Sequence, residues 1–179
     1  DRGLIRVFGE QLHGTCTDRI GYMPEERGLY KNMKVKELLQ FYGSLKNGTD
    51  LDREVNNWLE RFDLHDWANK KVETLSKGMS QKVQFIATII DKPKIIILDE
   101  PFSGLDPVNL ELIRDVVLEL RERGTTVIFS THDMAQAQHM CDRVFMIYRG
   151  KKVLDGTIDS IRQSSGACTV RVRMADDAQ

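Results

Sequence analysis

The stretch "IIILDEPFSGLDP", from Ile95 to Pro107, decides the fold of this 179-residue chain. Its consecutive aliphatic residues predict a strand covered on both faces, which is typical of the centre of a parallel sheet. Asp99 and Glu100 follow at the end of the strand, where open α/β sheets bind their ligands. Asp106 and Pro107 form a strong helix start, with Asp as the N-cap and Pro at the first helical position. The stretch therefore predicts an α/β fold with a site at this edge of the sheet.

The same alternation continues along the chain. From residue 94 onward the order is strand, helix, strand, helix, strand, which predicts a parallel sheet with right-handed crossovers. The second of these strands is "TTVIFS" (125–130), and "RVFMIYRGKKVLDG" (143–156) reads as a hairpin that turns at residues 149–151. Upstream, "LIRVFG" (4–9) is predicted to be one strand, and "RIGYMPEERGLY" (19–30) a strand that runs into a loop. Apolar periodicity predicts helices over 35–45, 51–62 and 74–90, the first closed by "KNGTD" (46–50).

The composition suits one globular domain, or one domain with part of a second. Hydrophobic residues make up 41% of the chain, and 26 basic residues balance 27 acidic ones, so no nucleic-acid-binding face is indicated. The longest aliphatic run is too short to cross a bilayer, and no signal peptide opens the chain. The chain begins with Asp rather than Met, so we expect a processed or truncated piece. The scattered Cys16, Cys141 and Cys168 predict reduced thiols in a cytosolic protein.

Three short stretches carry candidate chemistry. Asp99 would bind Mg²⁺ and Glu100 would polarise a water molecule, although such a pair can also simply cap the following turn. His132, in "STHD", follows the next strand and should lie at the same edge, where it would contact a terminal phosphate or serve a structural role. In "LSKGMSQ" (75–81), Ser76 and Gly78 begin a helix, which suits either an anion site or an ordinary N-cap with a turn.

The order of these motifs resembles the nucleotide-binding ATPase subunit of an ABC transporter. "IGYMPEERGLY", "LSKGMSQ", "IIILDEPFSGLDP" and "STHDM" match, in sequence order, that family's Q-loop, signature motif, Walker B with D-loop, and switch-histidine motif. The similarity covers residues 1 to about 160. "GYMPEERGLY" and "LSKGM" look most like the ABC-2 exporter branch, which includes sodium-extrusion-type ATPases.

The resemblance implies a fold and a division of the chain. The fold would be an α/β, parallel-sheet core of the P-loop NTPase type, with an inserted α-helical subdomain and the N-terminal part missing. Part of the core with the Q-loop would occupy residues 1–32, and the helical subdomain 33–75. The signature helix and the rest of the core would occupy 76–160. Residues 161–179 would form a linker, beginning at "RQSSGA" (162–167), and the start of an extension with "CTVRVRM" (168–174) as a strand.

The resemblance also implies roles for individual residues in ATP hydrolysis. Asp99 would hold Mg²⁺ together with Glu25 at the Q-loop position, Glu100 would be the general base, and His132 would contact the γ-phosphate. The remaining positions would act across a dimer of ATPase subunits, homo- or heterodimeric. Asp106 would lie in the D-loop that crosses to the partner, and the signature residues would meet the partner's nucleotide: Ser76, Lys77, Gly78 and Met79.

Three departures from the family pattern qualify these roles. Glu25 replaces the usual glutamine, which adds negative charge near the phosphates. The signature reads LSKGM rather than LSGGQ, and Lys77 either adds a cation near the phosphates or points to solvent; we favour solvent. No G-x-x-x-x-G-K-[ST] phosphate loop occurs in the 179 residues, and the one Gly-Lys pair, at 150–151, lies in the predicted hairpin turn. The chain thus resembles an ATPase truncated before the Q-loop, without the Walker A segment.

The leading hypothesis is an ATP-binding subunit that couples hydrolysis to export through separate transmembrane subunits at the cytoplasmic face of the membrane. This chain alone is expected neither to bind ATP and Mg²⁺ tightly nor to hydrolyse ATP, because the phosphate loop supplies most of the positioning and charge. An alternative is a non-catalytic or regulatory partner that offers Ser76 and Gly78 to a complete subunit. A soluble ABC ATPase of DNA repair or translation fits less well, since neither long heptad coiled coils nor tandem domains are present.

Overall fold

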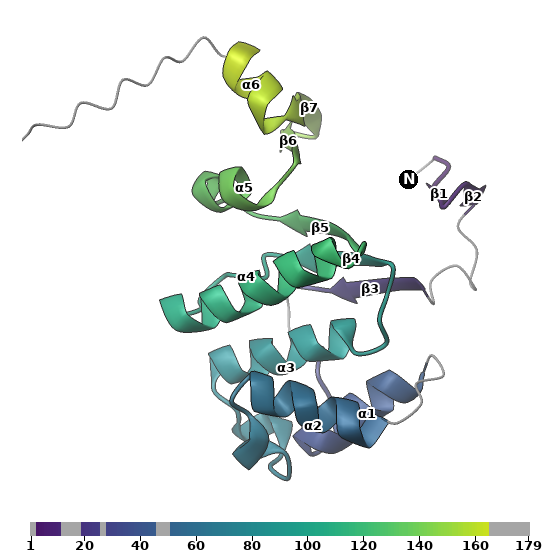
Figure 1. Cartoon of the computed structure of the whole chain (residues 1–179), viewed down its shortest axis with the longest axis vertical. Helices are drawn as coiled ribbons and strands as arrows, with labels where there is room; N and C mark the ends of the chain where they lie inside the picture. The colour runs from purple at the N-terminus through teal and green to yellow at the C-terminus, as the bar shows by residue number, and fades with distance from the viewer. Residues whose placement is uncertain (1–2, 12–18, 26–27, 46–50, 165–179) are drawn as a thin grey trace, which may run out of the picture. The chain divides into compact units, whose positions relative to one another are not determined.

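The computed structural model describes residues 3–11, 19–25, 28–45 and 51–164 (Figure 1). The predicted turn 46–50, the predicted strand 168–174, Cys16 and Cys168 lie outside these ranges, while Cys141 forms no disulfide within the described residues. The chain divides into two compact units, Asp1–His132 and Asp133–Gln179. Among the described helices, none has both the length and the apolar character that crossing a membrane requires.

The first unit is built on a three-stranded parallel sheet. Its strand order is β3–β4–β5, so β4, which carries "IIILD", is central as the sequence predicts. Ile97 of β4 pairs with Tyr22 on one side and Ile128 on the other. The strands are β3 (Ile20–Met23), β4 (Ile95–Asp99) and β5 (Thr126–Ser130). The expectation of a parallel α/β sheet is therefore confirmed.

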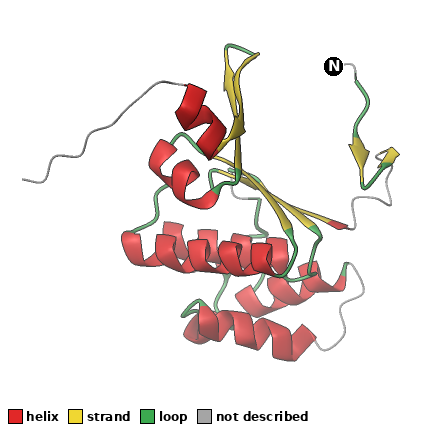
Figure 2. Cartoon of the chain, turned by 45° about the horizontal axis from the view of Figure 1, so that its top comes forward, coloured by secondary structure: helices red, strands yellow, loops and turns green. Residues whose placement is uncertain are grey.

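Four helices of the first unit lie on one side of this sheet (Figure 2). Helix α3 lies between α4 and the pair α1–α2 (Figure 1), so it connects the sheet with the helical part of the unit. Gly21 allows the close approach of α3 to β3, because a Cβ at Gly21 would lie 2.4 Å from the Thr88 carbonyl oxygen. The helices are α1 (Val35–Ser44), α2 (Leu51–Arg61), α3 (Lys77–Ile89) and α4 (Pro107–Glu122), with short 3₁₀ turns at His65–Trp67 and Val72–Thr74.

The core of the unit fills the space between the helices and the covered face of the sheet. Ile96 and Leu98 of β4 are fully buried there, and so are Phe62 and Phe85, whose ring centroids lie 5.9 Å apart. Other fully buried side chains come from α1, α2 and α4: Leu38, Leu39, Leu59 and Ile113. Burial of side chains of this size is the main stabilising contribution to such a unit.

The opposite face of the sheet carries apolar side chains without a covering layer among the described residues. We call it the open face; Tyr22 and Ile128 on it are 59% and 54% exposed, and Ile97 between them is half-buried. Asp99 and Ser130 end the strands on this same face, since residues two apart along a strand share a face. Parallel sheets are normally covered on both faces, so the open face is incomplete as a protein interior.

Two predictions about strands are wrong. "LIRVFG" is not one strand but the start of a hairpin, because Phe8 and Gly9 both have positive φ (53° and 84°) and turn the chain back. The strand expected to follow β5 in the parallel sheet pairs instead with its own hairpin partner. The elements concerned are β1 (Arg6–Val7) with β2 (Glu10–Gln11), and β6 (Arg143–Tyr148) with β7 (Lys151–Thr157).

The second unit contains this β6–β7 hairpin and two short helices, α5 (Met134–Met140) and α6 (Ile158–Ser164). The hairpin turns at Arg149 and Gly150, both with positive φ, where the sequence predicts a turn. Asp133 caps α5 by accepting hydrogen bonds from the backbone N–H groups of Ala135 and Gln136, at 2.8 and 3.2 Å. The predicted linker at 162–167 is partly wrong, because α6 continues to residue 164.

Candidate functional site

The carboxyl edge of the parallel sheet brings together three residues that the sequence singled out. The Nδ1 atom of His132 lies 2.9 Å from Oε1 of Glu100, and Asp99 ends the same strand that leads into Glu100. The Glu100 side chain is 20% exposed and that of His132 is 83% exposed, so a ligand can reach the pair from solvent. A carboxylate in contact with an imidazole is a suitable pair for accepting and handing on a proton.

Ser130 is a member of this cluster that the sequence reasoning did not single out. Its hydroxyl donates to the Asp99 carboxylate and accepts the backbone N–H of Glu100 at 3.0 Å. Asp99 and Ser130 are register partners in neighbouring strands. Ser130 could have been identified from the sequence, because it ends a strand two residues before His132 and therefore lies at the same edge of the sheet.

Asp99 is the cluster carboxylate that does not contact His132, and it suits a divalent cation. Within the ranges that the structure describes, no three His, Cys, Asp or Glu side chains converge on a point that would hold a metal ion. Mg²⁺ is usually bound by one or two carboxylates, with substrate phosphates and water completing its coordination. The carboxylate of Asp99, oriented by Ser130, therefore fits a Mg²⁺ that arrives with a phosphate ligand. Glu25 is exposed beyond β3, and no hydrogen bond or ion pair joins it to Asp99.

The signature residues lie at the N-terminus of α3. Ser76 is the N-cap, and its side chain accepts the Met79 backbone N–H at 3.2 Å. Gly78 faces the beginning of α4, with Leu105 and Asn109 within 4 Å of the position that a Cβ would occupy. Lys77 is exposed, and its ammonium lies over Gly104 in the turn that follows Glu100. The structure thus places Ser76 and Gly78 beside the turn that leads into α4, without a hydrogen bond from Ser76 to Asp99 or Glu100.

Asp106 caps α4 as the sequence predicts. Its carboxylate accepts the backbone N–H of Asn109 at 3.0 Å and also the Asn109 side-chain amide. These bonds hold the pKa of the Asp106 carboxyl below its ordinary value of 3.8. The bond from the Asn109 backbone makes the largest contribution, and the bond from the Asn109 side chain comes second. A depressed pKa means that the folded state binds the proton less tightly than the unfolded chain does.

We expect the stabilisation from Asp106 to be present above pH 3.8 and to be lost as the pH falls through the lower pKa of the folded state. Asp106→Ala should therefore lower the melting temperature at pH 7 and make less difference at an acidic pH well below 3.8. Asp106→Asn is the control, because asparagine is also a good N-cap but does not titrate. A melting-temperature difference between the wild type and Asp106→Ala that is equal at both pH values would contradict this assignment.

Three long polar side chains of α3 are buried, although the helix periodicity would place them at the surface. Each donates to a backbone carbonyl of another segment: Gln81 to Pro101 at 2.6 Å, Lys82 to Phe62 at 2.7 Å and Gln84 to Pro24 at 2.8 Å. Burial lowers the pKa of the Lys82 ammonium, while the Asp63 and Asp106 carboxylates act in the opposite direction. These bonds attach α3 to the turn after Glu100, to the end of α2 and to the residue before Glu25.

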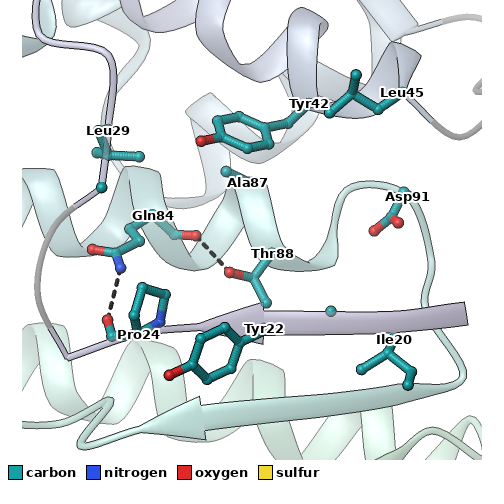
Figure 3. A pocket seen from close by; sticks show the side chains of 12 residues that line it. Ile20, Tyr22, Pro24, Leu29, Tyr42, Leu45, Gln84, Ala87, Thr88 and Asp91 are labelled. Carbon is teal, nitrogen blue, oxygen red and sulfur yellow. Dashed lines mark hydrogen bonds between the residues drawn. The ribbon is translucent and has the colours of Figure 1, made fainter. Parts of the chain in front are cut away.

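A pocket of about 200 Å³ lies beside β3, between α1 and α3 (Figure 3). Tyr42 and Leu45 face Ala87 and Thr88 across it, and Pro24 lies at the end of the strand. Burial raises the pKa of the Tyr42 phenol, and the neighbouring Tyr30 adds to this. The pocket is mainly apolar in character, and it adjoins the segment that carries Glu25.

A parallel α/β sheet with two carboxylates and a histidine at its carboxyl edge agrees with the P-loop-type ATPase core of the solved ATP-binding subunit that superposes on this chain. A model of the family "ABC transporter" matches residues 1–103. The chain belongs to the ABC transporter family. The confirmed family membership agrees with the resemblance stated from the four motifs.

Individual relatives agree with this assignment. The chain is 42% identical over 177 residues to the uncharacterized ABC transporter ATP-binding protein YhaQ of Bacillus subtilis, covering 98% of the chain and 59% of that protein. It is 36% identical over 160 residues to a fluoroquinolones export ATP-binding protein of Mycobacterium tuberculosis, covering 89% of the chain and 52% of that protein. A solved ATP-binding subunit of an ABC transporter superposes with a TM-score of 0.85 at 30% identity, covering 92% of this chain and 71% of that one. The chain thus spans between half and three fifths of the length of these two curated relatives.

Proposed function

We propose that this chain is the hydrolytic part of a longer ATP-binding subunit that drives export through separate transmembrane subunits. The observation that carries the proposal is the contact of Glu100 with His132, beside an Asp99 that is held by Ser130. Exporter names among the relatives support the direction of transport, since one of them is a fluoroquinolones export protein. The substrate would be selected by the membrane subunits.

In this proposal, Glu100 accepts a proton from the attacking water and His132 contacts the terminal phosphate. The 2.9 Å contact between them orients the carboxylate before the phosphate arrives. Mg²⁺, which accompanies ATP, would neutralise charge on the phosphate oxygens, and Asp99 is the residue that would hold it. Glu25 stands at the Q-loop position and would be a further metal ligand once nucleotide is bound.

Other residues would act on a second subunit. Ser76, Lys77, Gly78 and Met79 lie at the N-terminus of α3, which favours an anion because backbone N–H groups are exposed there. We propose that they meet the nucleotide of the opposite subunit in a dimer, and that Asp106 borders the segment that crosses to it. The adjacency of Gly78 to Leu105 and Asn109 supports a shared surface of these two motifs.

The uncovered apolar side chains of the open face support the proposal that this chain is part of a longer subunit. No phosphate-loop motif occurs in the 179 residues, and the apolar open face ends at Asp99 and Ser130. We propose that the phosphate-loop segment of the longer subunit covers this face and brings the phosphates to Asp99. We further propose that residues 33–75 form the helical subdomain, 1–32 and 76–160 the core, and 161–179 an extension.

The pocket between α1 and α3 is the proposed contact with the transmembrane partner, at the cytoplasmic face of the membrane. The pocket is mainly apolar, it adjoins the segment that carries Glu25, and it lies between the helical part of the unit and the sheet. A partner seated there would sense Glu25 through the bond from Gln84 to the Pro24 carbonyl.

The proposed function is tested by Mg²⁺-dependent ATP hydrolysis in the longer subunit. Asp99→Asn should lower turnover by about a hundredfold or more, because it removes a charge that balances the metal. Asp115→Asn, on the exposed side of α4, is the matched control and should leave turnover unchanged. Turnover that is equal in the wild type and Asp99→Asn would contradict the proposal.

A further inference from the structure

Glu100 has an unfavourable backbone conformation. Its φ is 47°, in the left-handed region that residues with a Cβ rarely adopt. The next residue is Pro101, and a residue before proline is biased toward extended conformations. Such a conformation persists only where the surrounding structure holds it from more than one side, and it is often found at functional sites.

Two hydrogen bonds hold the Glu100–Pro101 segment, one from β5 and one from α3. On the side of β5, the Glu100 backbone N–H donates to Ser130 Oγ at 3.0 Å. On the side of α3, the Gln81 side-chain amide donates to the Pro101 carbonyl at 2.6 Å. Gln81 is 6% exposed and Pro101 is buried, so no water replaces this bond easily.

We propose that Gln81 is a positioning residue that keeps Glu100 turned toward His132. The bond from Gln81 fixes the carbonyl of Pro101, the residue directly after Glu100. It thereby helps to hold the strained Glu100 backbone that orients the carboxylate. Because Gln81 lies one turn and a half along α3 from Ser76, the same helix links the signature residues to Glu100. The importance of this link for hydrolysis rests on the proposed function; the positioning itself does not.

Gln84 provides a matched control within the same helix. It is also a buried glutamine, 5% exposed, and it also donates to a proline carbonyl, that of Pro24 at 2.8 Å. Gln81→Leu and Gln84→Leu each remove one buried donor and leave one carbonyl without its partner. Their effects on overall stability should therefore be similar, while their effects on Glu100 should differ.

The test uses NMR of the 179-residue chain without nucleotide. In Gln81→Leu, the Glu100 amide should exchange about tenfold faster relative to the β4 amides, because loss of the bond to the Pro101 carbonyl loosens the segment and weakens the bond from this amide to Ser130. The His132 ring signals should shift as well, since the ring contacts the Glu100 carboxylate. In Gln84→Leu, the Glu100 amide exchange rate and the His132 ring signals should remain as in the wild type. Altered signals should appear near Glu25 instead. If Gln81→Leu does not fold, Gln81→Met is measured instead, because the methionine side chain has a similar length but no hydrogen-bond donor.

Glu100 and His132 signals that stay unchanged in the Gln81 variants, or that move equally in Gln84→Leu, would overturn the proposal. These readouts need no ATP. Absence of ATPase activity in the longer subunit would contradict the proposed function and leave the positioning role of Gln81 standing. Unchanged NMR signals would contradict the positioning role and leave the proposed function standing.

Discussion

Replacement of Glu100 by Gln in the longer subunit is expected to lower kcat for ATP hydrolysis by about 10²- to 10⁴-fold, the range for removal of a general base. Glutamine retains the size of the side chain and can still contact His132, but it cannot accept the proton of the attacking water. The contact at 2.9 Å should therefore survive while the chemistry does not. The measurement is steady-state phosphate release with saturating MgATP.

The control for this substitution is Glu111→Gln. Glu111 lies on α4, where its side chain is 65% exposed and 4.0 Å from Arg114, so its loss should leave kcat within about twofold of the wild type. MgATP affinity should be retained in Glu100→Gln, because the general base does not hold the nucleotide. A kcat for Glu100→Gln close to that of Glu111→Gln would show that another residue activates the water.

The largest effect on stability is expected for Phe85→Ala. Phe85 is fully buried on α3, where its ring packs against Phe62, and the substitution leaves a cavity between the helical part and the sheet. The expected loss is about 3–5 kcal/mol of unfolding free energy. Since domains of this size are stable by about 5–15 kcal/mol, this is a large part of the total, and the variant should unfold at a much lower urea concentration than the wild type. Urea denaturation followed by far-UV circular dichroism measures the loss.

Phe41→Ala is the matched aromatic control. Phe41 lies on α1, is 38% exposed and makes edge contacts with Tyr30 and Tyr42. Its removal should cost about 1 kcal/mol, the value of an aromatic contact without a large buried area. An unfolding free energy for Phe85→Ala equal to that for Phe41→Ala would mean that α3 is not the centre of the core.

Much of the fold could be predicted because its signals are local. The aliphatic run of β4, the Asp–Pro start of α4 and the apolar stripe of α3 each specify an element from neighbouring residues alone. The edge of the sheet followed from the same signals, since carboxyl ends of parallel strands meet. This is why Glu100 and His132 were expected together, and the structure brings them into contact.

The incorrect predictions concern pairing, which local signals do not encode. "LIRVFG" has the alternation of a strand, but the positive φ of Phe8 and Gly9 turns it into a hairpin. The predicted hairpin of β6 with β7 is confirmed, but the alternation of strands and helices wrongly placed β6 in the parallel sheet as well. Gln81 and Gln84 look like surface residues of α3 because their partners, two proline carbonyls, lie 20 and 60 positions away in the sequence.

The most direct test of the central claim is ATP turnover by the 179-residue chain itself, measured beside its Glu100→Gln variant. We assign Asp99 and Glu100 to ATP hydrolysis and the phosphate loop, which the 179 residues do not contain, to another part of the longer subunit. We expect phosphate release at the level of the buffer blank for both proteins, because positioning and charge at the phosphates are lacking. Turnover by the chain alone that disappears in Glu100→Gln would contradict this assignment.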